Sequence, residues 1–332
     1  MREATTIGIL GIAALLITAC SHDDGAAEWA ERGSELQINA CLTRSAALTP
    51  DEEVTLAVYQ TYGSDLHKGQ FIYSPTSGKW RSNIRAAKDE VYQLYGFMPA
   101  KNGITLQIDM LDDGYANGAA LTINGLSAIT DDDVCFIGGV KEGTEVSTSS
   151  DITEWNYQFV GQEEEQNFIN LLMEHVYANV KMSMLVGSNY ATLRTIKLKK
   201  ILLRPSSTAK TNITISQRNG QRPSFSYEAT DEEDVIPYLL ENEAGIELST
   251  TQPVIIETNV IPCANHLELV CTYDVYDKDG NPVSKDITTR NDLTGKIDLT
   301  PGTRTKLTLT VINSYLYTLS DSDAMNPRIM VE

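Results

Sequence analysis

Apolar and polar side chains alternate along many short segments of this chain. The segment 266–276, HLELVCTYDVY, places five apolar or aromatic side chains on one face: Leu267, Leu269, Cys271, Tyr273 and Val275. The segment 305–313, TKLTLTVIN, shows the same pattern. A period of two is typical of β-strands that pack one face on a core and expose the other face to water. The chain must therefore bury these faces by forming sheets.

Short runs rich in Val, Ile, Thr and Tyr recur along the body of the chain, separated by Gly, Asp, Asn, Pro or Ser. The other clear runs lie at 35–44, 53–62, 70–74, 91–100, 120–126, 133–139, 192–204, 211–217 and 253–260. Runs of this length between turn residues predict an all-β protein. About 310 residues follow the N-terminal signal described below, which favours two domains. We therefore predict two tandem β-sandwich domains.

One segment departs from the period of two. The segment 163–175, EEEQNFINLLMEH, places four side chains on one helical face: Phe168, Leu171, Leu172 and His175. This spacing, with acidic residues in the first turn, predicts a short amphipathic helix. We place the domain boundary at this helix, with an N-terminal sandwich at 35–173 and a C-terminal sandwich at 174–332. We expect His175 to lie in a core or at an interface.

Two local features of the predicted strands also have a physical explanation. In the run 195–204, the doubled Lys199-Lys200 breaks the alternation of apolar residues, and a β-bulge accounts for that break. The segment DKDGNP, at 277–282, lies between two strands and predicts a hairpin turn. Gly280 supplies the permissive backbone there.

An apolar run of eleven residues, 7–17, lies just before a cysteine near the N-terminus. The run is too short to span a bilayer as a helix, which needs about 20 residues. Its ending, Ile17-Thr18-Ala19-Cys20, resembles a bacterial lipobox. We therefore predict a lipoprotein signal peptide over 1–19, lipidation of Cys20 and a linker over 20–34; several acyl chains make such an anchor stable. The alternative is an ordinary signal peptide cut after Ala19.

The residues after Cys20 and the charge of the whole chain indicate where the protein works. The tail Ser21-His22-Asp23-Asp24 resembles the export signal of surface lipoproteins in the Bacteroidetes group. The chain has 26 basic and 45 acidic residues and a net charge of −19. Such a charge opposes binding to nucleic acid and to anionic membrane surfaces. We expect a lipoprotein of the outer membrane, exposed at the cell surface, with no nucleic-acid partner.

Four cysteines remain besides Cys20. They are widely spaced and lack any C-x-x-C pair: Cys41, Cys135, Cys263 and Cys271. Zinc motifs need compact ligand spacing, so the sequence predicts no metal site. An exported protein can form a disulfide, but the spacing does not identify its partners.

The sequence carries no compact catalytic motif. It lacks H-E-x-x-H, G-x-S-x-G, a P-loop and the dinucleotide glycine pattern. We therefore expect a non-enzymatic protein without a cofactor. A hydrolase on a β-scaffold stays an alternative, because the two carboxylates of a glycosidase need no local motif. A surface lipoprotein that binds glycans without polymerising is the nearer alternative, with Trp80 and Trp155 as stacking surfaces.

Several stretches, taken in order, resemble the fimbrillin family of Bacteroidetes surface pilins. The stretches after the lipobox are Thr43-Arg44-Ser45-Ala46, Gly78-Lys79-Trp80, VYQLYGFMPA at 91–100, FINLLMEHVYANVKMSM followed by LRTIKLKKILL, and PGTRTKLTLTVINSYLYTLSDSDAMNP at 301–327. The resemblance implies a pilus subunit of two transthyretin-like β-sandwich domains that supports adhesion. It also implies assembly with other fimbrial subunits and processing by an arginine-specific protease, which here would cut after Arg44 and before Ser45.

The cut has a physical logic of its own. Removal of the run 35–44 would strip one strand from a sandwich and leave a groove with unpaired backbone groups, which is costly. A strand from a neighbouring subunit could fill that groove by β-augmentation. The candidate donor is the C-terminal segment 303–332, which alternates over TKLTLTVINSYLYTL. The cut would also remove Cys20 and Cys41, so an obligatory disulfide at Cys41 would conflict with this route.

Overall fold

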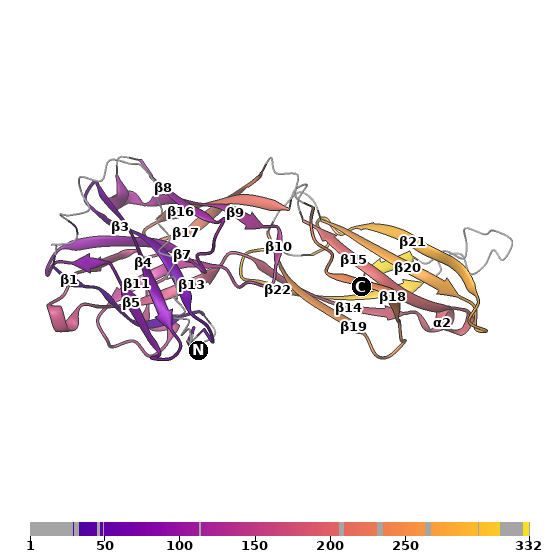
Figure 1. Cartoon of the computed structure of the whole chain (residues 1–332). Helices are drawn as coiled ribbons and strands as arrows, with labels where there is room; N and C mark the ends of the chain where they lie inside the picture. Colours follow the sequence, from indigo (N-terminus) through magenta and orange to yellow (C-terminus); the bar gives the residue numbers. More distant parts are fainter. Residues whose placement is uncertain are drawn as a thin grey trace, which may run out of the picture.

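The computed structural model of the chain is almost entirely β, as predicted. It describes residues 29, 33–44, 47–48, 50–112, 114–205, 209–230, 235–262, 267–297 and 299–312, together with the backbone of 328–331. The strands form two lobes that lie end to end (Figure 1). Each lobe contains two larger sheets and its own apolar core. The expected all-β class with sandwich-like sheets is confirmed.

The first lobe has a large curved sheet and a smaller one. The large sheet has the order β2 (Gln37–Leu42), β13 (Phe168–His175), β11 (Cys135–Glu142), β7 (Val91–Met98), β3 (Val54–Tyr62), β4 (Asp65–Ser74) and β5 (Lys79–Ser82), with β12 (Gln158–Val160) beside β7. The smaller sheet has the order β17 (Gln221–Ala229), β16 (Lys210–Arg218), β9 (Ala119–Ser127) and β8 (Thr105–Met110). A separate pair joins β1 (Ser34–Glu35) to β6 (Arg85–Ala86).

The two larger sheets of this lobe share one core. Buried side chains of both sheets, such as Ile213 of β16 and Phe136 of β11, belong to the same apolar cluster. Polar groups also join the sheets. The Tyr59 hydroxyl donates to the Leu106 carbonyl at 3.0 Å, and the Gln217 amide donates to the Ile137 carbonyl at 2.8 Å. These two bonds satisfy buried or half-buried donors across the sandwich.

The second lobe is also a two-sheet sandwich. One sheet has the order β10 (Ile129–Thr130), β19 (Val254–Val260), β14 (Ala178–Val186), β22 (Arg304–Ile312) and β23 (Arg328–Val331). The other has the order β18 (Leu240–Glu247), β15 (Thr195–Arg204), β20 (Glu268–Tyr276) and β21 (Pro282–Asp292). Alternate residues of β14 and β22, including Met182 and Leu309, are buried in the core between the sheets, as a period of two requires.

The chain passes between the lobes more than once. After β9 in the first lobe, β10 joins a sheet of the second lobe, and β11 returns to the first. Likewise β13 is followed by β14 in the second lobe, whereas β16 and β17 return to the first lobe after β15. The division into domains between residues 173 and 174 stays a prediction. The two cores, however, are not built from two continuous halves of the chain.

The predicted helix over 163–175 is wrong. A single 3-10 turn, η3 (Glu164–Gln166), is followed by the strand β13, which lies between β2 and β11. Five consecutive residues of β13, from Ile169 to Met173, are buried. A strand covered on both faces has a continuous apolar run, and periodicity alone does not distinguish such a run from a buried helix. Helical structure is instead found at α2 (Ser188–Leu193), which alternation did not predict, and in the 3-10 turns η1 (Tyr115–Asn117) and η2 (Ser149–Asp151).

The predicted bulge and turn are both present. The register of β15 shifts between Leu198 and Lys200 against both neighbouring strands. Gly280 has a φ of 86°, and two backbone hydrogen bonds close the turn between Asp277 and Asn281 and between Asp277 and Gly280. Glycine adopts this left-handed conformation without strain.

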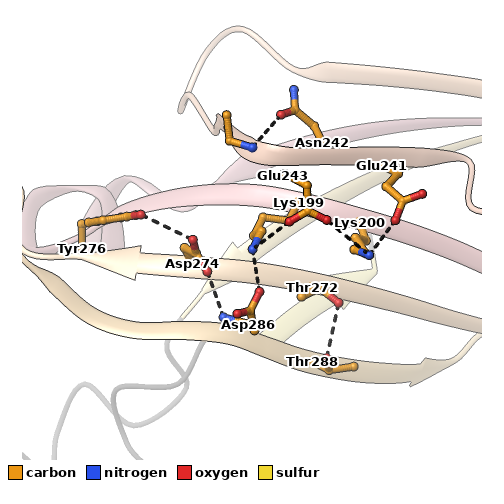
Figure 2. A network of polar contacts seen from close by, with 11 residues as sticks. Lys199, Lys200, Glu241, Asn242, Glu243, Thr272, Asp274, Tyr276, Asp286 and Thr288 are labelled. Carbon is orange, nitrogen blue, oxygen red and sulfur yellow. Dashed lines mark hydrogen bonds and ion pairs between the residues drawn. The ribbon is translucent and has the colours of Figure 1, made fainter.

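Figure 2 shows the two consecutive lysines at the bulge of β15 and their acidic partners on β18, which pairs with β15, and on β21, which lies beyond β20. The Nζ atom of Lys199 lies 2.6 Å from Asp286 of β21, and that of Lys200 lies 2.6 Å from Glu241 of β18. Both lysines also lie 3.7 Å from Glu243. The bulge thus joins three strands of one sheet through a single charge network.

Substitution of Met173 tests whether β13 is a strand buried on both faces. Met173 is fully buried, so Met173→Ala should lower the free energy of unfolding by about 2–5 kcal/mol. Met110, which is 49% exposed in β8, is the matched control, and Met110→Ala should change that free energy by less than about 0.5 kcal/mol. Denaturant unfolding measures both. In the helix predicted from the sequence, Met173 lies off the apolar face. Equal changes in the free energy of unfolding for Met173→Ala and Met110→Ala would therefore contradict the buried strand.

Candidate functional site: the first strand and its arginine

The first strand of the large sheet is held by one neighbouring strand. The strand β2 lies at the sheet edge and pairs in parallel with β13, with a register shift between Ile169 and Asn170. Parallel pairing is slightly less stable per residue than antiparallel pairing. A side-chain bond supports the ladder, because the Asn39 amide donates to the Asn170 side-chain oxygen at 2.8 Å. Within the described residues, no other sheet strand pairs along β2; a single bridge joins Leu42 to Ala47.

Apolar side chains of this N-terminal segment are nevertheless buried, most of them in the core of the first lobe. Five apolar side chains that precede Arg44 are buried: Trp29, Leu36, Ile38, Cys41 and Leu42. Trp29 stacks on the ring of His67 at 5.2 Å between centroids. Full burial of one large apolar side chain stabilises a protein by about 1.5–3 kcal/mol. The segment therefore contributes far more through side-chain burial than through the ladder of β2 with β13 and the short pairing of β1 with β6.

The start of the segment is clamped by polar groups. The side-chain amide of Asn167, just before β13, donates to the Ser34 carbonyl and hydroxyl, both at 3.0 Å, and to the Ala86 carbonyl at 3.2 Å. Arg85 donates two hydrogen bonds to the Gly33 carbonyl. Asn167 is 2% exposed, so these bonds form away from water, where an unpaired partner is costly.

Arg44 anchors the other end of the segment. Its Nε atom lies 2.7 Å from Glu174, and its Nη2 atom lies 3.4 Å from Glu154. Its guanidinium carbon lies 5.6 Å from the Trp155 ring centre, in cation–π geometry. The Ser149 hydroxyl donates to the Arg44 carbonyl at 3.3 Å. The arginine is thus held by residues of β13 and of the connection between β11 and β12.

The electrostatics of this anchor favour a charged, accessible arginine. The hydrogen bond to Glu174 raises the pKa of the Arg44 guanidinium above its ordinary value. Burial raises the pKa of the Glu174 carboxyl, although Arg44 opposes that shift. The Arg44 side chain is still 55% exposed, so its ion pairs are of the partly solvated kind, which stabilise little. A proteolytic enzyme could therefore withdraw this side chain at small cost.

The outer side of β2 borders a cavity. A hollow of about 400 Å³ lies between β2 and the turn from β4 to β5, with Tyr73 and Trp80 on its far wall. These two rings pack against each other at 5.2 Å between centroids. The edges β2 and β5 of the curved sheet thus face each other across a gap. The segment closes one side of the core without being locked between two strands.

The structure shortens the C-terminal segment that could act as the donor strand. The strand β22 (Arg304–Ile312) pairs with β14 and buries Leu307, Leu309 and Val311 in the core of its own lobe. Its removal would dismantle the second lobe, so residues 303–312 are unsuited to leave. The strand β23 (Arg328–Val331) is a short edge strand that pairs with only the last four residues of β22. The donor candidate is therefore reduced to residues 313–332.

The remaining residues singled out by the sequence fall into three groups. Cys20, with the signal peptide, and Ser45 lie outside the described residues. Cys41, Cys135 and Cys271 are free and buried, and Cys263 lies outside the described residues. Trp80 and Trp155 do not converge on one surface: Trp80 packs on Tyr73, and Arg44 occupies a face of Trp155.

Two residues that hold the N-terminal segment could not be recognised from the sequence. The partners of the segment, Asn167 and Glu174, lie more than a hundred residues from it and belong to no motif.

None of the helices in the described part of the chain has the length and apolar character to cross a bilayer.

Comparison with known proteins yields similar structures only. No family model matches the sequence, and no curated protein matches it. A proposed cell adhesion protein from Bacteroides uniformis is 10% identical over 89% of this chain and 96% of its own, with a TM-score of 0.40. A proposed polysaccharide-binding protein from Bacteroides thetaiotaomicron is 10% identical over 90% and 96%, with a TM-score of 0.35. A fimbrial protein from Bacteroides ovatus is 7% identical over 83% and 48%, with a TM-score of 0.31. Similarity at this level does not transfer a function, so function must be inferred from the residues of this chain.

The thiol of Cys41 reports whether the first strand stays in place. Burial raises the pKa of the Cys41 thiol to about 12, and only the thiolate attacks alkylating reagents. Intact protein should therefore label very slowly at Cys41. After cleavage at Arg44 and release of the segment, Cys41 should label at the rate of an unfolded peptide. Mass spectrometry of the labelled cysteines measures both rates.

Cys271 is the control for this labelling experiment. It lies in β20 of the second lobe, it is buried, and burial likewise raises the pKa of its thiol to about 12. It should stay protected before and after the cut. Rapid labelling of Cys41 in the uncut protein would show that the first strand does not fill the core in solution.

Proposed function

We propose that this protein is a structural, non-enzymatic subunit of a surface fimbria. In this proposal it is exported as a lipoprotein anchored through Cys20, and an arginine-specific protease cuts it between Arg44 and Ser45. Loss of the first strand then lets a strand from another fimbrial subunit enter the groove. The polymer supports adhesion at the cell surface.

One observation carries the proposal. The segment before Arg44 supplies four buried apolar side chains to the first core and a fifth, Leu42, to a small cluster beside it, yet only β13 pairs along β2 within the described residues. At about 1.5–3 kcal/mol each, these side chains together contribute on the order of 10 kcal/mol. A domain is stable by only about 5–15 kcal/mol, so a subunit without this segment needs a replacement strand.

The position of Arg44 is suited to release of the segment. It follows directly after the buried run, and its side chain is 55% exposed. A cut there separates every buried side chain of the segment from the rest of the chain. Once cut, the segment is held by the weak parallel ladder, the short pairing of β1 with β6, the Asn167 and Arg85 hydrogen bonds and its side-chain burial.

The C-terminal residues have the composition of a replacement strand. The run 313–319, NSYLYTL, places Tyr315, Tyr317 and Leu319 at alternate positions. A strand of this pattern presents one apolar face to a groove while its backbone pairs with the exposed edge of β13. Because a subunit would donate from one end and accept at the other, the contact is head-to-tail and does not close, which gives a filament.

The alternative is a surface lipoprotein that binds glycans and does not polymerise. It depends on Trp80 and Trp155, which the structure places in separate surroundings. Retention on glycan columns that is lost in both Trp80→Ala and Trp155→Ala, without any oligomers after trimming, would favour this alternative.

Arg44 itself tests the processing step. Trypsin-like enzymes hydrogen-bond the guanidinium of their substrate, and such sites reject a side chain that lacks the matching group by about 10⁴-fold. Treatment of the wild-type protein with an arginine-specific protease should give one trimmed product that begins at Ser45. Arg44→Ala should abolish that product, whereas Arg81→Ala, which removes an arginine 72% exposed in β5, should leave it unchanged. A main product cut elsewhere would contradict the proposal.

Deletion of residues 313–332 tests the donor step separately. The deletion leaves β22 and its core contacts in place, so trimming at Arg44 should proceed as in the full chain. Trimmed full-length protein should form a ladder of oligomers on non-denaturing gels, and the trimmed deletion variant should form none. A mixture of the deletion variant with full-length protein should shorten the ladder, because the variant accepts but does not donate. Unchanged oligomers from the deletion variant alone would rule out this donor.

A further inference from the structure

Three potential metal ligands meet at the junction between the two lobes. They are Asp133 in the connection from β10 to β11, Cys135 at the start of β11 and His175 at the end of β13. Their ligand atoms lie within 4.8 Å of one another. The Nδ1 atom of His175 lies 2.6 Å from Asp133 Oδ1 and 3.4 Å from Cys135 Sγ, and the two partners lie 3.7 Å apart.

The backbone holds these residues in place. Cys135 and His175 are direct partners in the antiparallel register of β11 and β13. One residue further on, the Val176 amide donates to the Val134 carbonyl at 2.8 Å. Asp133 therefore follows a fixed path beside the other two residues, although its side chain is 55% exposed and can adjust.

The cluster does not have the geometry of a nucleophilic triad. A Cys-His-Asp relay uses both ring nitrogens, one toward the thiol and the other toward the carboxylate. Here Cys135 and Asp133 approach the same nitrogen, Nδ1, so the carboxylate does not orient a base toward the sulfur. Burial, followed by the Asp133 charge, also raises the pKa of the Cys135 thiol, whereas a reactive cysteine needs a lowered one.

The three ligand atoms instead lie close enough together to bind one metal ion. Thiolate, imidazole and carboxylate are the three donors that zinc takes in proteins, at about 2.3 Å for sulfur and about 2.0 Å for nitrogen and oxygen. Tetrahedral angles at these lengths place ligand atoms about 3.3–3.6 Å apart. The two distances to sulfur already fit, and the pair Asp133 Oδ1 and His175 Nδ1 must open by about 0.7 Å. The exposed Asp133 side chain can make that movement.

A fourth ligand position has an approach from solvent. His175 borders a cavity of about 280 Å³ that is also lined by Glu174, Arg44 and Phe225. The buried sulfur closes the inner side of the cluster, and the Asp133 carboxylate, 55% exposed, leaves the outer side open to water. Three protein ligands and one water complete a tetrahedral zinc site.

We propose that Asp133 Oδ1, Cys135 Sγ and His175 Nδ1 bind a zinc ion, with water as the fourth ligand. The ion would join two of the connections between the lobes, because Asp133 follows β10 and His175 precedes β14, and both of those strands belong to the second lobe. The site thus stiffens the junction in the manner of a structural cross-link. It does not depend on the cut at Arg44.

Cobalt titration tests the site directly. The full chain, reduced, stripped with a chelator and desalted, is titrated with Co²⁺, whose bond to a thiolate gives a charge-transfer band in the near ultraviolet. The expected result is one Co²⁺ per chain with this band, and displacement of the Co²⁺ by one equivalent of Zn²⁺. Absence of a thiolate band, or binding only at millimolar metal, would overturn the proposal.

Variants identify the ligands. Cys135→Ser should remove the band, and Asp133→Asn and His175→Gln should each weaken Zn²⁺ binding in calorimetry by at least about 100-fold. Cys271→Ser and His67→Gln remove the same chemical groups elsewhere and should bind as the wild type does. Asp133→Asn alters an exposed side chain, so it tests the site even where the core variant Cys135→Ser fails to fold. Equal binding by Asp133→Asn, or loss of the band in Cys271→Ser, would contradict the assignment.

Discussion

The parallel ladder between β2 and β13 is the interaction on which the first lobe depends. It is the only sheet pairing along β2 in the described part of the chain, and it places buried side chains of the N-terminal segment over the core. The ladder itself is weak, since it is parallel and lies at an edge. The apolar side chains of the segment, in contrast, are extensively buried. A strand with strong side-chain contacts and few backbone contacts is well suited to exchange, because another strand of similar pattern restores most of the lost free energy.

The way the chain alternates between lobes limits what can be exchanged. The strand β13, which accepts β2, is continuous through a short connection with β14 of the second lobe, and β14 pairs with β22. The edge exposed by loss of β2 is therefore tied firmly to both lobes. The same arrangement fixes β22 in its own core, so a donor segment has to lie beyond β22. Interleaved lobes thus confine the exchange to the terminal segments of the chain.

The strands with one solvated face were predictable, and the doubly buried strand was not. In β22, water on one face imposes a period of two, and the residues 305–313 show it. The residues 266–276 of β20 alternate as well, although Val270 and Asp274 on its other face are also buried. In β13, neighbours on both faces and both edges remove that signal, so Leu171 and Leu172 match a helical spacing by coincidence. The doubled lysines at 199 and 200 were informative because a bulge is the simplest way to keep apolar residues inward on both sides of the break.

The candidate site was predictable only in part for a similar reason. Arg44 stands at the end of an apolar run and can be read from the sequence. Its partners Glu174 and Glu154, and the Asn167 clamp, are brought to it by strand pairing across more than a hundred residues. The cluster of Asp133, Cys135 and His175 has no compact spacing either, because a sheet register and not a loop assembles it.

The N-terminus of the subunit in its assembled state tests the central claim most directly. Mass spectrometry of polymers released from the cell surface would identify the first residue of the mature chain. The exchange of strands requires that residue to be Ser45, with no peptide from 20–44 in the polymer. Polymers whose chains begin at an acylated Cys20 and keep the first strand would contradict the account.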